Sequence, residues 1–479
     1  MSETVHPTHT DGVVASVSAG VGGPLGTRAG RHRWWTPVRV VLALAALTFA
    51  LGMVQKSACY EDTWTDGTTR YTQMCYSDLP YLYTGRGFAE LAWPYDDDAD
   101  VRSRYEVMEY PVGIAYWAFA TAKVAQVLTG SPDVSERAQR PTSEFFGDPE
   151  VQREIRAFVI VNALGFAVLV LLAAWLLAKV DPRRPWDAAM FAASPALALT
   201  ALVNWDLAAV ALVAGALWAW ARDRPALTGV LIGLGAATKL YPLFLLGAVL
   251  VICLCDRRVR DFVVTTAAAV AAWVLANAPA YLRGPEEWKV FWTFNSDRGP
   301  DLGSAWLVVS QATDGIDAST VNTWSWLLFG GWCVGVFVLG ILAPETPRMA
   351  QLGFLIVAGF LLVNKVYSPQ YVLWLLPLAV LARPRWRDQI VWQATEIFYF
   401  AAVWWYLGGF LAPGGGGDAG VYWVAIVLRM AGELFLVGLV VRDILVPRKD
   451  PVRADAARLE APPGDPPQDT TTRSNVVAV

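Results

Sequence analysis

"TPVRVVLALAALTFALGMV", residues 36–54, decides the fold, because it is an almost wholly apolar run of the length that crosses a bilayer. Comparable runs lie near residues 112–129, 155–178, 187–203, 206–221, 226–238, 240–255, 262–278, 323–343, 349–364, 370–382, 391–411 and 421–445. These blocks are continuous and do not alternate between polar and apolar residues, which favours helices over a barrel. The sequence therefore predicts an all-α polytopic membrane protein with 12 or 13 transmembrane helices.

The composition agrees with this class. Of 479 residues, 55% are hydrophobic and 17% are charged, and the mean hydropathy is +0.39. A soluble chain carries charge on about a quarter of its residues. The net charge of -4 says little, because the distribution of Lys and Arg orients a membrane protein. Arg28, Arg31 and Arg33 precede the first run, which predicts an uncleaved anchor with a cytoplasmic N-terminus.

Basic segments orient the later runs. Those expected in the cytoplasm are 221–225, 255–261, 382–388 and 441–450. The segments then left on the extracytoplasmic side are 204–206, 238–242, 279–322, 364–371 and 412–420. This alternation fails between residues 112 and 186, so either one element there is re-entrant or the number of spans differs by one.

The chain divides into a membrane domain and two tails. Residues 1–33 and 447–479 are rich in small and polar residues, which predicts disordered cytoplasmic tails. Residues 34–446 form the predicted transmembrane domain, with extracytoplasmic loops at 55–111 and 279–322.

Five cysteines fall into two groups. Cys253, Cys255 and Cys333 lie in or beside apolar runs, where a small buried hydrophobe is the ordinary interpretation. Cys59 and Cys75 bracket the polar segment after the first run. If that segment is extracytoplasmic, they either form a disulfide or remain as two thiols, and their spacing does not choose between these states.

The segment "CYSDLPYLYTGR", residues 75–86, places polar groups directly after the first span. Asp78 has two compatible interpretations, as the N-cap of a following helix or as a general base that accepts a proton from a bound hydroxyl. Tyr81 and Tyr83 are either interfacial aromatic residues or the walls of a sugar site. Arg86 suits bidentate recognition of phosphate.

Further polar residues interrupt or flank the apolar runs. Glu109 and Tyr110 open the run at 112–129, where a carboxylate either complements the helix dipole or binds substrate. Asn204 and Asp206 interrupt a long apolar stretch, and intramembrane carboxylates are costly enough to indicate function. Lys239 either snorkels to the interface or faces an anionic headgroup.

Two extracytoplasmic loops complete the predicted substrate-binding set. Asn295 and Arg298 lie in an aromatic, glycine-containing loop that suits either a sugar or an ordinary surface turn. Lys365 and Gln370 lie at the boundary of a run. No phosphate-binding glycine loop, HExxH or GxSxG motif competes, and the three histidines lie in or beside the N-terminal tail. We expect no metal and no cofactor.

The order of these motifs resembles a known family. "SDLPYLYTGRG", "EYPVG", "SPALALTALVNWDLAAVALVAGAL", "GVLIGLGAATKLYPLFLL" and "KVYSPQYVLWLLPLAVLARP" are similar to segments of the C-type (GT-C) polyprenol-phosphate-sugar-dependent glycosyltransferases. The likeness is greatest to glycosyltransferase family 87 and its actinobacterial mannosyltransferase-like branch. It covers residues 36–445.

The resemblance implies an enzyme of the cell membrane with its active site on the outer face. It would move a sugar, mannose or arabinofuranose, from a polyprenyl-phosphate donor to a glycolipid or glycan acceptor with inversion. The implied general base is Asp78, with Glu61 and Asp62 of the same loop as alternatives. Lys239, Arg86 and Arg298, in that order, would hold the departing phosphate. The expected partners are donor, acceptor and membrane lipids, and no nucleic acid.

Two other classes remain open from the sequence. A transporter or flippase also has polar residues in broken spans, but the chain shows no internal repeat of the kind that such proteins tend to have. A non-catalytic membrane scaffold would keep the fold and bind a partner protein.

Overall fold

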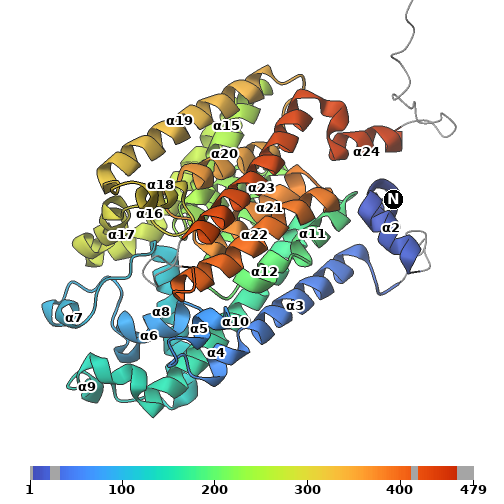
Figure 1. The fold of residues 1–479 in the computed structure, drawn as a ribbon. Helices are drawn as coiled ribbons and strands as arrows, with labels where there is room; N and C mark the ends of the chain where they lie inside the picture. The colour runs from blue at the N-terminus through green and yellow to red at the C-terminus, as the bar shows by residue number, and fades with distance from the viewer. Residues whose placement is uncertain (1–3, 22–32, 412–418, 461–479) are drawn as a thin grey trace, which may run out of the picture.

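The computed structural model describes residues 4–21, 33–411 and 419–460, which form helices and no strand (Figure 1). The predicted all-α class is confirmed. The longer helices are α3 (Pro37–Gln55), α8 (Val112–Thr129), α10 (Pro149–Ala178), α13 (Asp206–Trp220), α14 (Pro225–Ala236), α15 (Leu245–Cys255), α16 (Val259–Arg283), α17 (Pro285–Asp297), α19 (Ala318–Leu342), α20 (Met349–Val363), α21 (Val372–Ala382), α22 (Trp386–Leu407) and α23 (Gly420–Leu445).

Shorter helices lie between and beside these. They are α1 (Pro7–Thr10), α2 (Gly12–Gly20), α4 (Ser57–Glu61), α5 (Thr69–Thr72), α6 (Leu79–Gly85), α7 (Ala99–Arg104), α9 (Val134–Arg137), α11 (Ala189–Ala192), α12 (Pro195–Thr200), α18 (Ala305–Ala312) and α24 (Pro451–Glu460). The main 3-10 turns are η2 (Phe88–Glu90), η3 (Thr142–Gly147), η4 (Pro185–Ala188), η5 (Tyr241–Phe244), η6 (Pro369–Tyr371) and η8 (Pro447–Lys449).

Among the described residues, five helices have the length and apolar composition of membrane spans: α3, α10, α16, α19 and α23. Five shorter apolar segments of 10–17 residues pack among them, at 206–220, 225–236, 241–255, 349–363 and 369–382. The polytopic class is therefore consistent with the structure. The predicted number of 12 or 13 spans is not decided by these criteria and stays a prediction.

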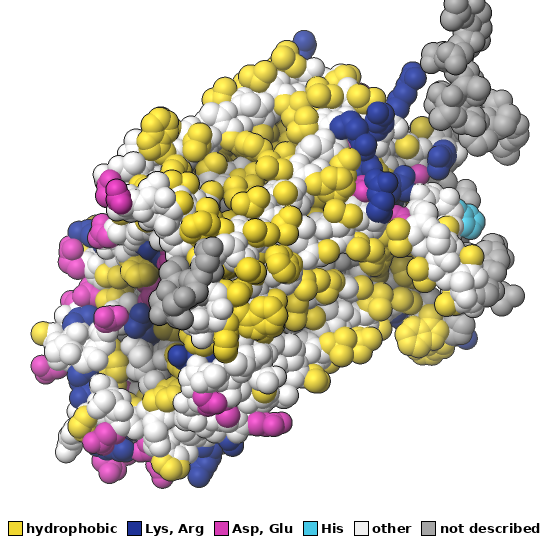
Figure 2. All heavy atoms as spheres, in the orientation of Figure 1, with side chains coloured by type: hydrophobic (Ala, Val, Ile, Leu, Met, Phe, Trp, Pro, Cys, Tyr) yellow, Lys and Arg dark blue, Asp and Glu magenta, His cyan; other side chains and the backbone are white. Residues whose placement is uncertain are grey.

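The two ends of the bundle differ in what they carry. α2 and α24 lie at one end, whereas α4 to α7, α9 and α17 gather at the other (Figure 1). Hydrophobic side chains cover the face between the ends, and charged side chains collect toward the ends (Figure 2). This is the distribution that a bilayer around the middle of the bundle requires.

α8 contacts the polar loop after α3 at both of its ends. Tyr110, just before its start, donates a hydrogen bond to Asp78 at 3.2 Å. Near its end, Gln126 donates hydrogen bonds to the carbonyls of Phe88 and Ala89 at 3.1 and 3.0 Å. An unbroken helix of 18 residues is about 27 Å long, so these contacts do not choose between a re-entrant element and a different number of spans, and both predictions stay open.

α14 and α16 approach each other closely through glycine. A Cβ at Gly229 would collide with the carbonyl of Thr265, and one at Gly233 would collide with the carbonyl of Ala269. Small residues four apart on one helix face let two backbones come together, which is a common way to pack membrane helices. α14 thereby holds the following turn, with Lys239, in a fixed position.

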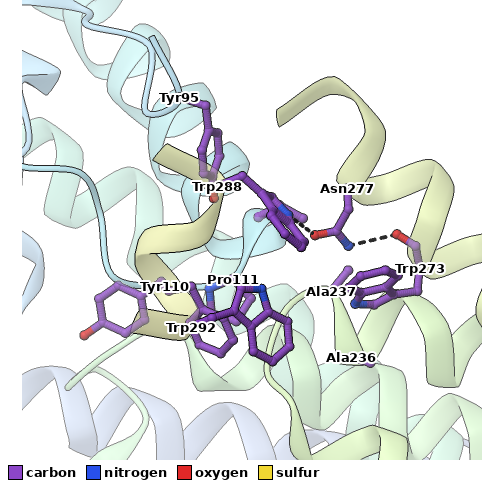
Figure 3. A pocket seen from close by; sticks show the side chains of 11 residues that line it. Tyr95, Tyr110, Pro111, Ala236, Ala237, Trp273, Asn277, Trp288 and Trp292 are labelled. Carbon is purple, nitrogen blue, oxygen red and sulfur yellow. Dashed lines mark hydrogen bonds between the residues drawn. The ribbon is translucent and has the colours of Figure 1, made fainter. Parts of the chain in front are cut away.

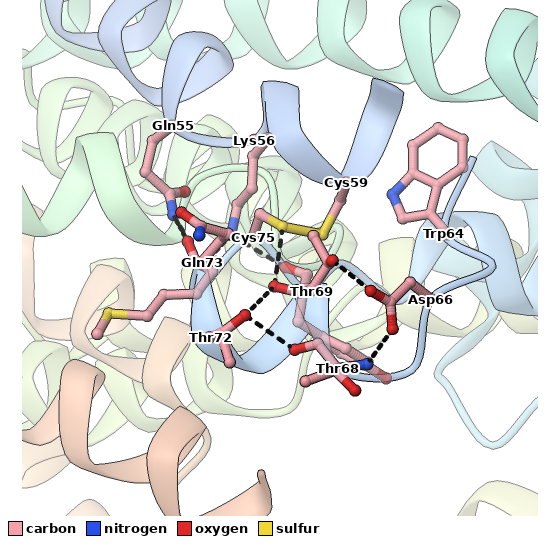
Figure 4. Close-up of a disulfide and its surroundings, with 12 residues drawn as sticks. Gln55, Lys56, Cys59, Trp64, Asp66, Thr68, Thr69, Thr72, Gln73 and Cys75 are labelled. Carbon is pink, nitrogen blue, oxygen red and sulfur yellow. Dashed lines mark hydrogen bonds between the residues drawn. A yellow bond between two sulfur atoms is a disulfide. The ribbon is translucent and has the colours of Figure 1, made fainter. Parts of the chain in front are cut away.

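A disulfide closes the loop after α3. Cys59 in α4 is bonded to Cys75, which follows α5, with 5.7 Å between their Cα atoms (Figure 4). Of the two states left open by the sequence, the structure therefore has the disulfide. The bridge anchors the chain three residues before Asp78.

The N-terminal tail, for which the sequence predicts disorder, carries the helices α1 and α2 in the structure. Asp11 caps α2 by accepting a hydrogen bond from Val13 N at 3.0 Å. Its other oxygen accepts from Trp386 N at 3.0 Å, and Val5 N donates to the carbonyl of Arg183 at 2.8 Å. These contacts dock the tail on the bundle and offset the entropy of ordering it.

The C-terminal tail is likewise helical over residues 451–460, where disorder was expected. Asp455 in α24 accepts a hydrogen bond from Arg184 Nη1 at 2.5 Å, and both side chains are buried. Arg28, Arg31 and residues 461–479, on which the sequence predictions also rested, lie outside the described residues.

Candidate active site

A cavity of about 670 Å³ opens at the end of the bundle that carries α5, α6 and α17. Its wall combines the polar loop after α3, the turns around residues 204, 239 and 365, and the helices α17, α19 and α22. Nine predicted site residues line it: Asp78, Glu109, Tyr110, Asn204, Lys239, Asn295, Arg298, Lys365 and Gln370. Residues that are far apart in the sequence thus share one space.

Asp78 is held by side chains from two other segments. Its Oδ2 accepts hydrogen bonds from Asn204 Nδ2 at 2.6 Å and from the Tyr110 hydroxyl at 3.2 Å, and Asn204 also donates to Tyr110 at 2.7 Å. The backbone N of Asp78 donates to the carbonyl of Val203 at 2.9 Å. Asp78 starts α6, but its side chain makes no capping hydrogen bond to that helix. The Asp78 carboxylate therefore lines the cavity and does not cap the helix.

The environment of Asp78 shifts its proton affinity. Burial raises the pKa of the Asp78 carboxyl above 3.8, while hydrogen bonds from Tyr76 and Tyr110 and the charge of Lys239 oppose the shift. A carboxylate with a raised pKa is a stronger base than a free one. Asp78 can therefore take a proton from a bound hydroxyl.

Lys56, just beyond the end of α3, braces the segment before Asp78. Its Nζ donates to the carbonyls of Tyr76, at 3.0 Å, and Met74, at 3.3 Å. Burial lowers the pKa of Lys56 to about 7, with the charge of Asp78 opposing the shift. A buried ammonium is costly, so its retention beside Asp78 indicates a role in this site.

Lys239 is fixed between two partners. Its Nζ lies 3.5 Å from Oδ1 of Asp206 and 4.8 Å from the ring centre of Tyr110. Asp206 is fully buried and also accepts a hydrogen bond from Trp374 Nε1 at 2.6 Å. Asp206 itself does not line the cavity, so it acts through Lys239, whose charge it keeps in place.

Two further cations reach the cavity from loops. Arg298 donates to Asp301 at 2.7 Å through Nε, and Asp301 N donates to the carbonyl of Lys365 at 2.8 Å. Lys365 Nζ donates to Asn322 Oδ1 at 2.6 Å and to the carbonyl of Ser296 at 3.2 Å. With Lys239, these side chains give the cavity three cationic groups that suit a phosphate.

Three polar atoms that line the cavity have no hydrogen-bond partner among the described residues. They are Gln370 Oε1, Ser325 Oγ and Trp404 Nε1, and all are buried. Gln370 and Trp404 are only 5% and 2% exposed. Buried polar groups are normally satisfied, so these three atoms lack partners that a sugar hydroxyl would supply if a bound ligand moved the side chains of the wall. Asn295, in contrast, bonds within its own helix, to the carbonyl of Phe291 at 2.7 Å.

Tyr81 and Tyr83 are not brought to the cavity. Tyr83 is fully buried and donates to Glu154 at 2.8 Å. Tyr81 stacks on Tyr76, which lines the cavity, with 5.7 Å between ring centres. Their assignment to a sugar site stays a prediction that no contact in the structure supports.

Arg86 also lies outside the wall of the cavity. It donates to Glu109 Oε2 through Nη2 at 2.7 Å and lies 3.5 Å from Glu106. These partners do not set Arg86 apart, because Arg298 is likewise paired with Asp301 and Lys239 with Asp206. Arg86 differs from both in that it does not line the cavity, and its role in phosphate binding stays a prediction.

A narrow aromatic cleft adjoins the cavity and shares Tyr110, Pro111, Phe291 and Trp292 with it. In Figure 3, Asn277 accepts a hydrogen bond from Trp288 Nε1 at 2.8 Å. α17, which contributes Trp288 and Trp292, has no buried residue. Phe291, Trp292 and Phe294 of this helix line the cavity, whereas Trp288 lines only the narrow cleft.

Sequence reasoning missed several residues of the site. Lys56 and Trp404 carry no motif, and each resembles an ordinary residue at or near the end of a span. Tyr76 lies in the segment 75–86, but the sequence analysis gave it no role. Asn322 ends the predicted loop 279–322, and Ser325 lies in the apolar run that follows it. A polar residue within the first turns of α19 was the one available signal.

Within residues 4–21, 33–411 and 419–460, no group of three or more His, Cys, Asp or Glu side chains could hold a metal ion. The expectation that the reaction needs no metal or cofactor still awaits a direct test.

Comparison with known proteins gives one match. The family model described as Glycosyltransferase family 87 matches residues 151–369, which confirms the resemblance found in the sequence. No curated protein matches the chain. The matched part includes Asn204, Asp206 and Lys239 but ends before Gln370 and does not reach back to Asp78. The matched residues make up less than half of the chain. The match shows a likeness to a family of glycosyltransferases over this part of the sequence.

Proposed function

We propose that this membrane glycosyltransferase transfers a sugar, mannose or arabinofuranose, from a polyprenyl-phosphate donor to a hydroxyl of an envelope glycolipid or glycan. The transfer takes place on the extracytoplasmic face of the cell membrane and inverts the anomeric carbon. One observation carries the proposal: a half-buried carboxylate, Asp78, shares one cavity with three cationic groups, those of Lys239, Arg298 and Lys365.

The chemistry needs only these groups. Asp78 removes the proton from the acceptor hydroxyl as its oxygen attacks the anomeric carbon. The bond from that carbon to the phosphate oxygen breaks, and the polyprenyl phosphate leaves with the electron pair. Cations stabilise this developing charge, and phosphate is a good enough leaving group to need no acid. Holding donor and acceptor in line supplies part of the rate enhancement.

The shape of the cavity supports a lipid-linked donor. Phe329 and Phe360 line it beside Trp326 of α19, which is 59% exposed on the apolar side of the bundle. An aromatic edge open toward lipid lets an isoprenoid chain remain in the membrane while its phosphate enters. A volume of about 670 Å³ falls in the range of small-molecule sites.

The distribution of charge supports the proposed side of the membrane. α2 and α24 lie at the end of the bundle opposite the cavity, and the basic segments at 382–388 and 441–450 belong to that end. The positive-inside rule favours a cytoplasmic position for that end. The Cys59–Cys75 disulfide beside the cavity supports the same orientation, since disulfides persist outside the cytoplasm.

Reconstituted protein tests this function. Liposomes containing the purified chain receive polyprenyl-phosphate donors with radiolabelled mannose or arabinofuranose, together with total envelope glycolipids as acceptors. We expect label in the glycolipid fraction with one of the two donors. Label from a sugar nucleotide but from neither lipid donor would contradict the proposal. Leakage of lipid or solute without any transfer would favour the transporter alternative.

A further inference from the structure

A buried charged group lies between α22 and α23, away from the cavity wall. We name Arg429 and Glu433 of α23 and Glu396 of α22 the buried ion cluster. Arg429 Nη1 donates to Glu433 Oε2 at 2.8 Å. Their exposed fractions are 0%, 0% and 3%. None of the three was singled out from the sequence, and the transfer reaction does not use them directly.

These charges are expensive where they lie. α23 is one of the five candidate spans, so Arg429 and Glu433 are held inside the membrane region. Ionisable side chains in spans are rare and generally serve a function. A well-packed apolar replacement for a buried ion pair is often neutral or stabilising, so stability alone does not account for the cluster.

The buried ion cluster contacts one aromatic side chain, Tyr367, in two ways. The guanidinium of Arg429 lies 3.7 Å from the ring centre of Tyr367. The Tyr367 hydroxyl donates to Glu396 Oε2 at 3.0 Å, and Trp392 Nε1 donates to the other oxygen of Glu396 at 3.1 Å. One contact fixes the face of the ring and the other fixes its edge, which leaves Tyr367 no freedom to rotate.

Tyr367 belongs to a loop in which most residues line the cavity. Lys365, Ser368 and Gln370 line it, whereas Tyr367 is fully buried and does not. The Tyr367 side chain therefore links the loop at 364–371 to α22 and α23.

Tyr367 also contacts a second loop, at residues 298–304. Tyr367 N donates to the carbonyl of Leu302 at 2.6 Å, and the Tyr399 hydroxyl donates to the carbonyl of Tyr367 at 2.5 Å. Gly303, with φ of 69°, donates through its N to the Tyr422 hydroxyl at 2.9 Å. A Cβ at Gly303 would collide with the Tyr399 hydroxyl and the Tyr367 carbonyl. The two loops are therefore closely packed at this glycine.

We propose that the buried ion cluster is a positioning element for the donor. Through Tyr367 it holds the loops 298–304 and 364–371 in register, so that Arg298, Lys365 and Gln370 point together at the phosphate and sugar of the donor. The inference rests on the proposed function for the identity of that ligand. It makes Arg429, Glu396 and Tyr367 positioning residues for donor binding.

The test compares Tyr367→Phe with Tyr116→Phe. Tyr367→Phe removes the hydroxyl held by Glu396 and keeps the ring. Tyr116→Phe is the matched control, because its hydroxyl joins α8 to α16 by donating to the carbonyl of Ala276 at 3.1 Å. We expect Tyr367→Phe to raise the KM for donor about tenfold, the size of one lost hydrogen bond to a charged group. The KM for acceptor and the saturated kcat should stay close to wild type, as should all three values in Tyr116→Phe.

Conservative replacement of Glu396 supplies a rescue. In Glu396→Gln, the amide can donate to the Tyr367 hydroxyl while its oxygen accepts from Trp392, so the KM for donor should stay within about threefold of wild type. Glu396→Leu loses both contacts and should match Tyr367→Phe. Equal losses of donor and acceptor affinity, or a lowered melting temperature with an unchanged KM for donor, would overturn the inference. If a variant fails to fold, Tyr399→Phe perturbs the same loop from outside the cluster.

Binding of decaprenyl phosphate alone separates this inference from the proposed function. Wild-type protein in nanodiscs that binds this lipid, with about tenfold weaker binding by Tyr367→Phe, supports the inference even if no sugar is transferred. Transfer failure in that case counts against the proposed function only. Equal binding by both proteins, or binding by neither, overturns the inference.

Discussion

Replacement of Asp78 by asparagine is the most direct perturbation of the site. The variant keeps the size of the side chain and one oxygen that can accept the hydrogen bond from Asn204 Nδ2, now 2.6 Å long. The backbone hydrogen bond from residue 78 to Val203 is unaffected. Asp78→Asn should therefore fold and bind as the wild type does, while losing the group that accepts a proton.

The size of the loss follows from that single change. A positioned general base contributes about 10² to 10⁴ in rate, equivalent to about 2.7 to 5.4 kcal/mol of transition-state stabilisation. Burial raises the pKa of Asp78 and makes it a stronger base, which favours the upper part of that range. Affinity for polyprenyl phosphate should change by no more than about threefold, since the cationic groups are untouched.

The assay is single-turnover transfer of labelled sugar in liposomes, with decaprenyl-phosphate binding measured in parallel. Glu61→Gln and Asp62→Asn are run beside it, because both carboxylates lie in the same loop but outside the cavity wall. The reasoning is refuted if Asp78→Asn retains more than about a tenth of the wild-type rate, or if Asp62→Asn or Glu61→Gln shows the loss instead. Asp78→Asn that also fails to bind the lipid would make Asp78 a structural residue.

Three further outcomes are expected. Gln370→Leu should raise the KM for donor about tenfold without lowering the melting temperature, because the Gln370 amide oxygen has no partner within the described residues; an unchanged KM would remove Gln370 from the site. The value of kcat/KM should fall as pH drops through the raised pKa of Asp78, since only the carboxylate accepts a proton. Lys56→Met should move this acidic limb of the pH–rate profile upward by about 1 pH unit, because it removes a nearby cation. An acidic limb that stays in place would show that Lys56 does not influence the base. Replacement of both Cys59 and Cys75, 16 residues apart, by serine should lower the free energy of unfolding, measured by denaturation, by about 3 kcal/mol. The same variant should have a reduced kcat in the transfer assay. Full activity would show that the disulfide does not hold Asp78 in position.

Much of the site was accessible from the sequence. Asn204, Asp206 and Lys239 stand out because a polar side chain in an apolar run costs free energy that only a partner or a function offsets. Asp78 and Tyr110 stand out because they lie at span boundaries on the side opposite the basic segments. These are local signals, and they hold in the structure.

Other parts of the site depended on pairing over long distances. Asp78 and Asn204 are 126 residues apart, and neither segment carries a sequence signal that predicts the other as its partner. Arg86 carries the chemistry of a phosphate ligand, yet Glu109 partners it in the fold. Tyr367 resembles its loop neighbours in sequence, but it is fully buried against Arg429 and does not line the cavity.

The sequence by itself determined the helical membrane class, the expected orientation of the basic ends and the side on which polar residues gather. These follow from burial of apolar runs and placement of charge, which depend on each segment and its immediate surroundings. Only the tertiary structure decided which polar side chains share a cavity and which neutralise one another. That choice depends on packing between helices that are distant in the sequence. Successive side chains on a helix point about 100° apart, so one residue can meet a buried partner while the next faces an open surface.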